Sequence, residues 1–186
     1  MKFDKYEKRG AYHWKEYAGR TPYRKLAETV SSFFPERGSV LDVGCGDGLI
    51  SYLLHRKGLK VTGIDNHPLA IKFARKNTKG QIEFKLLNIY KASSRLKNRR
   101  FHYLLASEVI EHLPDPSILK KLLLRHCKRY AVITTPLKRQ KKGKYHYREY
   151  TPKELVEVFH PLKCKLLKVT ADRIYLKVIP KKITAK

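Results

Sequence analysis

The sequence predicts an α/β fold: a doubly wound, mostly parallel seven-stranded sheet with helices on both faces. Short apolar runs alternate with helical patterns along most of the chain, which is typical of a parallel sheet covered on both sides. A glycine-rich turn follows the first apolar run, and an acidic residue, Asp65, ends the second. The length of 186 residues suits one domain, so we predict a single domain over residues 1–186.

Residues 1–34 are predicted to form an N-terminal helical arm. It is rich in aromatic and polar residues, and Thr21 followed by Pro22 is typical of a helix start. Apolar runs predict the seven strands, and helical spacing of apolar residues predicts the helices between them. The strands are expected at residues 39–43, 59–64, 82–86, 101–106, 130–134, 165–170 and 173–179. The helices are expected at residues 21–34, 47–57, 68–77, 117–127 and 151–159.

The charge of the chain points to an anionic polymer as partner. There are 42 Lys and Arg against 16 Asp and Glu, a formal net charge of +26. Positive side chains in such excess repel one another in a compact fold, and the phosphates of a nucleic acid can neutralise them. We therefore predict RNA, either rRNA or tRNA, as the partner. Apolar runs are too short to span a bilayer and no leader pattern is present, so we expect no membrane and a cytoplasmic location.

A basic loop over residues 137–150 is the predicted substrate contact. Its Lys and Arg residues can hold phosphates, and the aromatic residues between them can stack an unpaired base. The residues predicted to bind substrate are Lys138, Arg139, Lys141, Lys142, Tyr145, Tyr147 and Arg148.

The glycine turn and Asp65 together predict an adenosine-containing cofactor. Glycines let the backbone approach a ligand closely, and an acid at the end of the second strand accepts the hydroxyl groups of a ribose. A dinucleotide site favours the spacing G-x-G-x-x-G, whereas this turn has G-x-G-x-G at residues 44–48. The strand before the turn also carries Asp42, whose charge would repel a pyrophosphate but suits an amino-acid group. These features favour S-adenosylmethionine (SAM) over a dinucleotide.

On these residues the sequence resembles the class I SAM-dependent methyltransferases. Segment 41–48 is similar to their first motif, segment 63–65 to their second and segment 107–113 to their fourth. The resemblance implies that Asp42 and the glycine turn hold the methionine part of SAM and that Asp65 holds the ribose. It also implies an antiparallel last strand. The implied cofactor-binding residues are Asp42, Gly44, Cys45, Gly46, Gly48, Asp65, Asn66, Asn88, Ile89 and Ser107.

The methyl acceptor is expected at the end of the fourth strand, with Glu108 and His146 as catalytic groups. No metal is predicted, but carboxylate and imidazole groups there leave a metal site as an alternative. That alternative set is Glu108, Glu111, His112 and His146. We predict a SAM-dependent methyltransferase acting on a base or ribose of rRNA or tRNA. The alternatives are a small-molecule or protein methyltransferase, and a catalytically silent RNA-binding module on the same fold.

Overall fold

Seven strands in the order β3-β2-β1-β4-β5-β7-β6 form the sheet of the computed structural model. The structure describes residues 4–19, 21–138, 143 and 145–180. The chain divides into two compact units, residues 1–91 and residues 92–186. Most strands are parallel and one runs antiparallel, as predicted. The predicted α/β fold class is therefore confirmed.

The first unit has the parallel strands β1 (Ser39–Val43), β2 (Lys60–Asp65) and β3 (Glu83–Leu86), with β2 in the middle. Its helices α4 (Leu49–Arg56) and α5 (Pro68–Asn77) pack against β2, and α5 also reaches β3. The buried residues of these strands include the apolar Val40, Val61, Ile64 and Phe84, as is expected where helices cover a parallel sheet. Helix α3 (Pro22–Ser32) packs on α4 through buried residues such as Leu26 and Val30.

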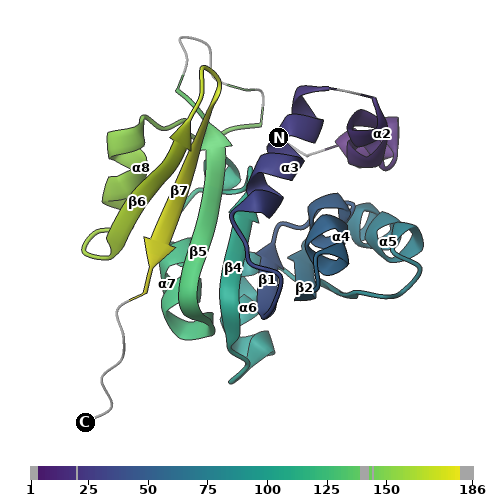
Figure 1. Cartoon of the computed structure of the whole chain (residues 1–186), viewed down its shortest axis with the longest axis horizontal. Helices are drawn as coiled ribbons and strands as arrows, with labels where there is room; N and C mark the ends of the chain where they lie inside the picture. The colour runs from purple at the N-terminus through teal and green to yellow at the C-terminus, as the bar shows by residue number, and fades with distance from the viewer. Residues whose placement is uncertain (1–3, 20, 139–142, 144, 181–186) are drawn as a thin grey trace. The chain divides into compact units, whose positions relative to one another are not determined.

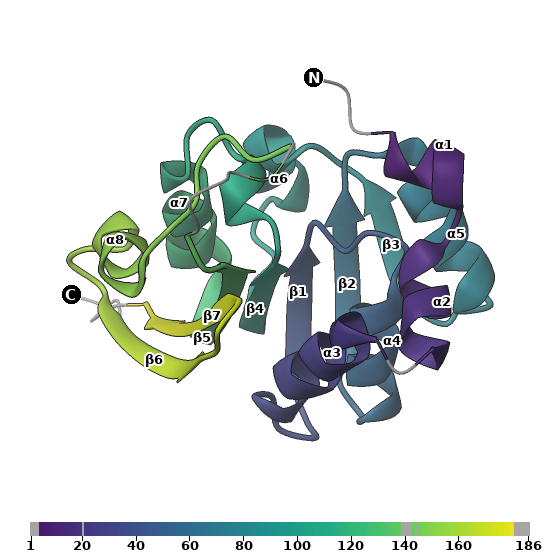
Figure 2. The ribbon, with the colours of Figure 1, turned by 90° about the horizontal axis from the view of Figure 1, so that it is seen from above.

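Two short helices, α1 (Lys5–Arg9) and α2 (Tyr12–Ala18), begin the described chain. Figure 2 shows α1 and α2 beside α5. Tyr6 and Tyr12 are buried in a cluster with Ala70, and Leu69 and Phe73 pack against it. The aromatic residues that suggested an arm therefore attach these helices to α5.

The second unit has β4 (Phe101–Ser107), β5 (Cys127–Pro136), β6 (Lys163–Val169) and β7 (Arg173–Ile179). Strand β5 is parallel to β4, and β7 is antiparallel to both β5 and β6 (Figure 1). Helix α7 (Ser117–His126) packs on β4 and β5, and α8 (Pro152–Val158) on β6. The implied antiparallel last strand is confirmed.

Three local features differ from or refine the predicted elements. Helix α6 (Ile89–Leu96) was not predicted; Asn88 Oδ1 accepts a hydrogen bond from the Tyr90 amide at its start, 2.9 Å away. A short 3₁₀ turn, η1 (Ile110–His112), follows β4. At α8, Thr151 and Glu154 form the capping box that their spacing indicates.

Among the described helices, none combines the length and the apolarity that crossing a lipid bilayer requires.

Candidate cofactor and acceptor sites

The glycine turn between β1 and α4 has a backbone that favours glycine. Gly44, Gly46 and Gly48 have φ angles of 68°, 56° and 83°, in the left-handed region where a side chain is strained. The amides of Gly44 and Cys45 donate to the Ile64 carbonyl at 2.8 and 3.1 Å. The turn is therefore fixed against the end of β2, where Asp65 lies.

Asp65 accepts two backbone hydrogen bonds, one of them from the glycine turn. Its Oδ2 accepts from the Gly46 amide at 2.9 Å, and its Oδ1 accepts from the His67 amide at 2.8 Å. Burial raises the pKa of this carboxyl above its ordinary value, while the two amides oppose that shift. The structure thus brings together the turn and the acid that the sequence marked 19 residues apart.

Asp42 is buried on β1, with 3% of its surface exposed. The Ser51 hydroxyl donates to its Oδ2 at 2.6 Å. Burial raises the pKa of Asp42 to about 7, although the hydrogen bond from Ser51 lowers it in part. The carboxyl is therefore harder to ionise in the folded protein than in the unfolded chain.

This difference predicts a pH dependence of stability. In the unfolded chain Asp42 ionises near pH 4, and in the folded protein only near pH 7. Between these values the folded state binds more protons than the unfolded chain. The contribution of Asp42 to the free energy of unfolding therefore falls as pH rises, by about 1.4 kcal/mol per pH unit at most. Urea unfolding of wild type and Asp42→Asn at pH 5, 6 and 7 measures how the free energy of unfolding changes with pH. We expect a shallower decline in Asp42→Asn; equal slopes would contradict the assignment.

Asp47, next to the turn, is a contact that sequence reasoning missed. It is 1% exposed, and its carboxylate accepts from the backbone amide of His13 at 3.0 Å and pairs with His13 Nδ1 at 3.1 Å. Trp14 Nε1 donates to the Asp47 carbonyl at 2.9 Å. A Cβ on Gly46 would lie 2.5 Å from the Tyr6 hydroxyl. Helices α1 and α2 therefore cover the glycine turn. The sequence features that could have indicated this contact are the acid inside the turn, Asp47, and the adjacent His13 and Trp14 in the arm.

The other predicted cofactor residues differ in accessibility. Asn66 and Asn88 are exposed, and Ile89 is half-buried. Cys45 is buried, and burial raises the pKa of its thiol well above the ordinary value. In the second unit, Ser107 Oγ forms a hydrogen bond with Thr134 Oγ1 at 2.9 Å.

Glu108 follows β4 and is oriented by two neighbours. Its φ is 56°, a left-handed conformation uncommon for a residue with a side chain. Thr134 Oγ1 donates to its Oε1 at 3.0 Å, and Arg173 Nη2 donates to its Oε2 at 3.2 Å. The carboxylate therefore has a cationic partner from β7.

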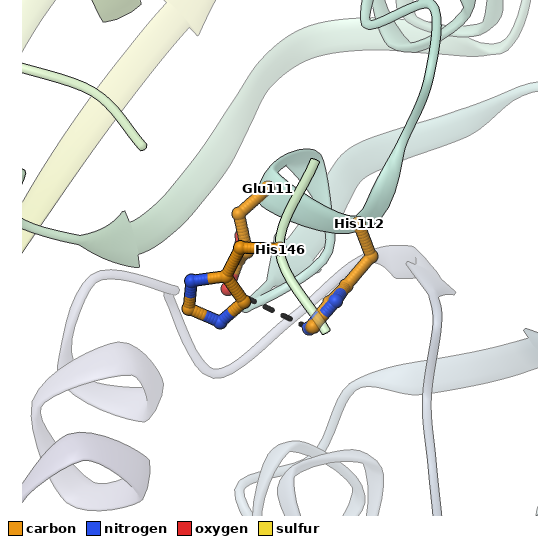
Figure 3. Close-up of side chains that lie close together, drawn as sticks. All are labelled: Glu111, His112 and His146. Carbon is orange, nitrogen blue, oxygen red and sulfur yellow. Dashed lines mark ion pairs between the residues drawn. The ribbon is translucent and has the colours of Figure 1, made fainter. Parts of the chain in front are cut away.

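Three of the four alternative metal ligands lie together. Figure 3 shows Glu111 and His112 from the η1 turn beside His146 from the loop before α8. One ligand atom from each lies within 4.8 Å of the other two. Glu108, the fourth residue of the predicted set, is not a member of this group.

The predicted substrate residues in the described part of the loop have varied surroundings. Lys138 is exposed and pairs with Glu154 at 2.8 Å. Tyr147 is exposed, whereas Tyr145 is half-buried and its carbonyl pairs with His112 Nδ1. Arg148 Nη2 donates to the Pro114 carbonyl at 3.3 Å. Arg139, Lys141 and Lys142 lie outside the described residues.

A protein-family model described as a methyltransferase domain matches residues 14–163, which include the glycine turn, Asp65 and the Glu111–His112–His146 group. The chain belongs to this methyltransferase family. Its strand order and glycine turn place it among the class I SAM-dependent enzymes, as the resemblance implied.

The methyltransferase domain is also similar to curated proteins. It is 28% identical over 134 residues to a ubiquinone biosynthesis O-methyltransferase of Pasteurella multocida, covering 63% of this chain and 55% of that protein. It is 33% identical over 93 residues to the protein of the same name from Xanthomonas oryzae, covering 48% and 37%. The chain thus spans about half the length, or less, of these curated relatives.

Solved structures share the fold at low sequence identity. Magnesium protoporphyrin IX methyltransferase from Synechocystis, solved with bound SAH, superposes with a TM-score of 0.72 at 14% identity, over 95% of this chain and 97% of that one. A TehB-like SAM-dependent methyltransferase from Corynebacterium glutamicum gives 0.72 at 17% identity, over 96% and 100%. These similarities confirm the Rossmann-like methyltransferase fold.

The residues of the first unit fit SAM. Gly44, Gly46 and Gly48 contribute no side chains of their own to the turn, and Asp65 is held beside that turn by the Gly46 amide. A carboxylate in this place is the acceptor that a pair of ribose hydroxyls needs.

Proposed function

We propose that this methyltransferase domain binds SAM at the glycine turn and transfers its methyl group to a hydroxyl oxygen of a small molecule. The observation that carries the proposal is the contact of Asp65 with Gly46, since it joins a ribose acceptor to a turn shaped for close ligand approach. The names of the curated relatives, which are O-methyltransferases of ubiquinone biosynthesis, support an oxygen acceptor and a small molecule rather than RNA.

When bound, SAM supplies a methyl carbon on a positively charged sulfur, so the acceptor oxygen forms the new C–O bond as the C–S bond breaks and its electrons stay on sulfur. The domain's main contribution to such a displacement is to position the two reactants. We assign Asp65, Asp42 and the glycine turn to the cofactor. We assign Glu108 and His146 to the acceptor, where the hydroxyl proton must leave. Arg173 Nη2 donates to Glu108 Oε2 at 3.2 Å, and His146 Nδ1 pairs with Glu149 Oε1 at 3.0 Å, so both side chains are oriented by neighbouring residues.

The test is a transfer assay with purified protein and SAM. A panel of phenols, catechols and aliphatic alcohols is incubated with the enzyme, and SAH formation and the methylated product are measured by mass spectrometry. We expect SAH to form with at least one phenolic or alcoholic acceptor and the product to carry an O-methyl group. Binding of SAM without transfer to any member of the panel would contradict the small-molecule part of the proposal.

RNA is the second candidate acceptor, favoured by the net charge of +26. Neutralisation of phosphates releases counterions, so the RNA affinity should fall steeply as salt rises. Filter binding of tRNA and rRNA transcripts between 50 and 200 mM salt measures this dependence. We expect the RNA affinity to fall about tenfold or more over that range if several phosphates are contacted. A salt-independent affinity, or no methyl group in RNA after incubation with SAM, would contradict this second candidate.

A further inference from the structure

We propose that Glu111, His112 and His146 bind a divalent transition-metal ion. The group combines one carboxylate with two imidazoles, and its ligand atoms lie within 4.8 Å of one another. Two imidazoles and a carboxylate suit zinc, cobalt or iron better than magnesium, which prefers oxygen ligands. The inference does not depend on which acceptor the enzyme uses.

Glu111 provides the strongest evidence that a cation belongs there. Its side chain is 1% exposed. Thr135 Oγ1 donates to Oε2 at 3.0 Å, but Oε1 is buried and accepts no hydrogen bond from the described residues. A buried carboxylate oxygen without a donor is costly. A metal ion bound by both Glu111 and His112 would provide the missing positive charge beside Oε1. His112 Nε2 lies 3.9 Å from Oε1 (Figure 3).

Both imidazoles are oriented as metal-binding histidines usually are. His112 Nδ1 pairs with the Tyr145 carbonyl at 2.9 Å, which fixes the proton on Nδ1 and leaves Nε2 as the basic nitrogen. His146 Nδ1 pairs with Glu149 Oε1 at 3.0 Å, a carboxylate–histidine pair of the kind that supports metal ligands. The two rings meet edge to face with centroids 5.0 Å apart.

The loop that carries His146 is fixed to the η1 turn by its backbone. The Tyr147 amide donates to the Glu111 carbonyl at 2.8 Å. Glu149 Oε1 also accepts from the Gly143 amide at 2.8 Å, and a Cβ on Gly143 would lie 2.5 Å from the His146 ring. His146 therefore lies beside Glu111 through contacts that do not involve its own Nε2.

The geometry requires a small adjustment on binding. Ligand atoms about 2.1 Å from a tetrahedral metal are roughly 3.4 Å apart. The distances between the three ligand atoms, now up to 4.8 Å, must therefore shorten by about 1 Å. Side-chain rotation of the two partly exposed histidines, at 34% and 17% exposure, can provide this. Three protein ligands leave a coordination position for water or for an oxygen of the acceptor.

The test is titration of tag-free, metal-stripped protein with Co²⁺ and Zn²⁺ by calorimetry, with the Co²⁺ absorption spectrum as a second readout. We expect one site per chain and weaker binding of Mg²⁺. His112→Ala and His146→Ala should each lower the Co²⁺ affinity at least tenfold, and Glu149→Gln should lower it by a smaller factor. His55→Ala, a half-buried histidine of the first unit, is the matched control and should bind Co²⁺ as wild type does.

Glu111→Gln separates a metal ligand from a structural carboxylate. The amide keeps the shape and the acceptor for Thr135, so the thermal midpoint of the metal-free variant should equal or exceed that of wild type, while Co²⁺ binding is lost. The same variants should bind SAH as wild type does, so a failed metal site is distinguishable from a failed cofactor site. Absence of a Co²⁺ site in wild type, or equal Co²⁺ affinity in wild type, His112→Ala and His146→Ala, would overturn the proposal.

Discussion

Replacing Asp65 with alanine is expected to weaken SAH binding about 100-fold or more. The variant removes the charged acceptor proposed for both ribose hydroxyls, and hydrogen bonds to a charged group contribute about 1.5–3 kcal/mol each. Two such bonds correspond to at least two orders of magnitude in affinity. Alanine also removes the acceptor of the Gly46 amide, which loosens the turn. Calorimetric titration of the purified variant with SAH measures the loss.

Asp65→Asn and Glu157→Ala complete this experiment. Asparagine keeps one oxygen acceptor but replaces the other with a donor, so we expect a loss between those of wild type and Asp65→Ala. Glu157 is an exposed acid of α8, and its removal changes the net charge equally without touching the turn. Wild-type SAH affinity in Asp65→Ala would refute the ribose role, as would an equal loss in Glu157→Ala.

Asp47→Ala is expected to lower the free energy of unfolding by about 3 kcal/mol. The buried carboxylate accepts from the His13 amide and pairs with the His13 ring, and removing one partner of a buried pair leaves the other without compensation. Urea unfolding measures the change. Trp14 is the only tryptophan of the chain and bonds to the Asp47 carbonyl, so its fluorescence reports directly on this contact. A red shift of the folded-state emission should accompany the loss as α2 moves away from the turn.

Glu28→Ala is the matched control for Asp47→Ala. Glu28 pairs with Arg24 on the surface of α3, where the two side chains are 50% and 42% exposed. Exposed pairs contribute about 0–1 kcal/mol, so the variant should unfold almost as wild type does and keep its tryptophan emission. Similar losses in Asp47→Ala and Glu28→Ala would show that the buried pair has no special role.

The sequence predicts most of the fold because its apolar runs and helix ends are strong local signals. The range predicted for α5 agrees with the structure at both ends, since Pro68 begins the helix and the apolar spacing stops at Asn77. Helix α6 was missed because its start is marked only by the Asn88 side chain, without proline or glycine. Strand β5 begins at Cys127, earlier than predicted, because the exposed charged residues Lys128 and Arg129 interrupt its apolar pattern.

The candidate sites were less predictable, because they depend on contacts between distant residues. The spacing of Glu108, Glu111 and His112 indicates one face of a helical turn, but Glu108 adopts a left-handed conformation before the 3₁₀ turn and pairs with Arg173 of β7. No local pattern reveals that pairing. The contact of His13 with Asp47 likewise joins two segments with no shared motif. By contrast, Asp65 and the glycine turn could be placed together, since adjacent parallel strands bring their carboxyl ends to one edge.

The position of β7 between β5 and β6 affects how the chain folds while it is synthesised on the ribosome. Translation releases β5 and then β6, but both are hydrogen-bonded to β7, which emerges after them. Until then the nascent chain carries an apolar strand with an open edge, and such edges pair readily with other chains. Slow synthesis of the last segment should therefore increase aggregation, and chaperones that shield nascent strands should improve the yield of folded protein.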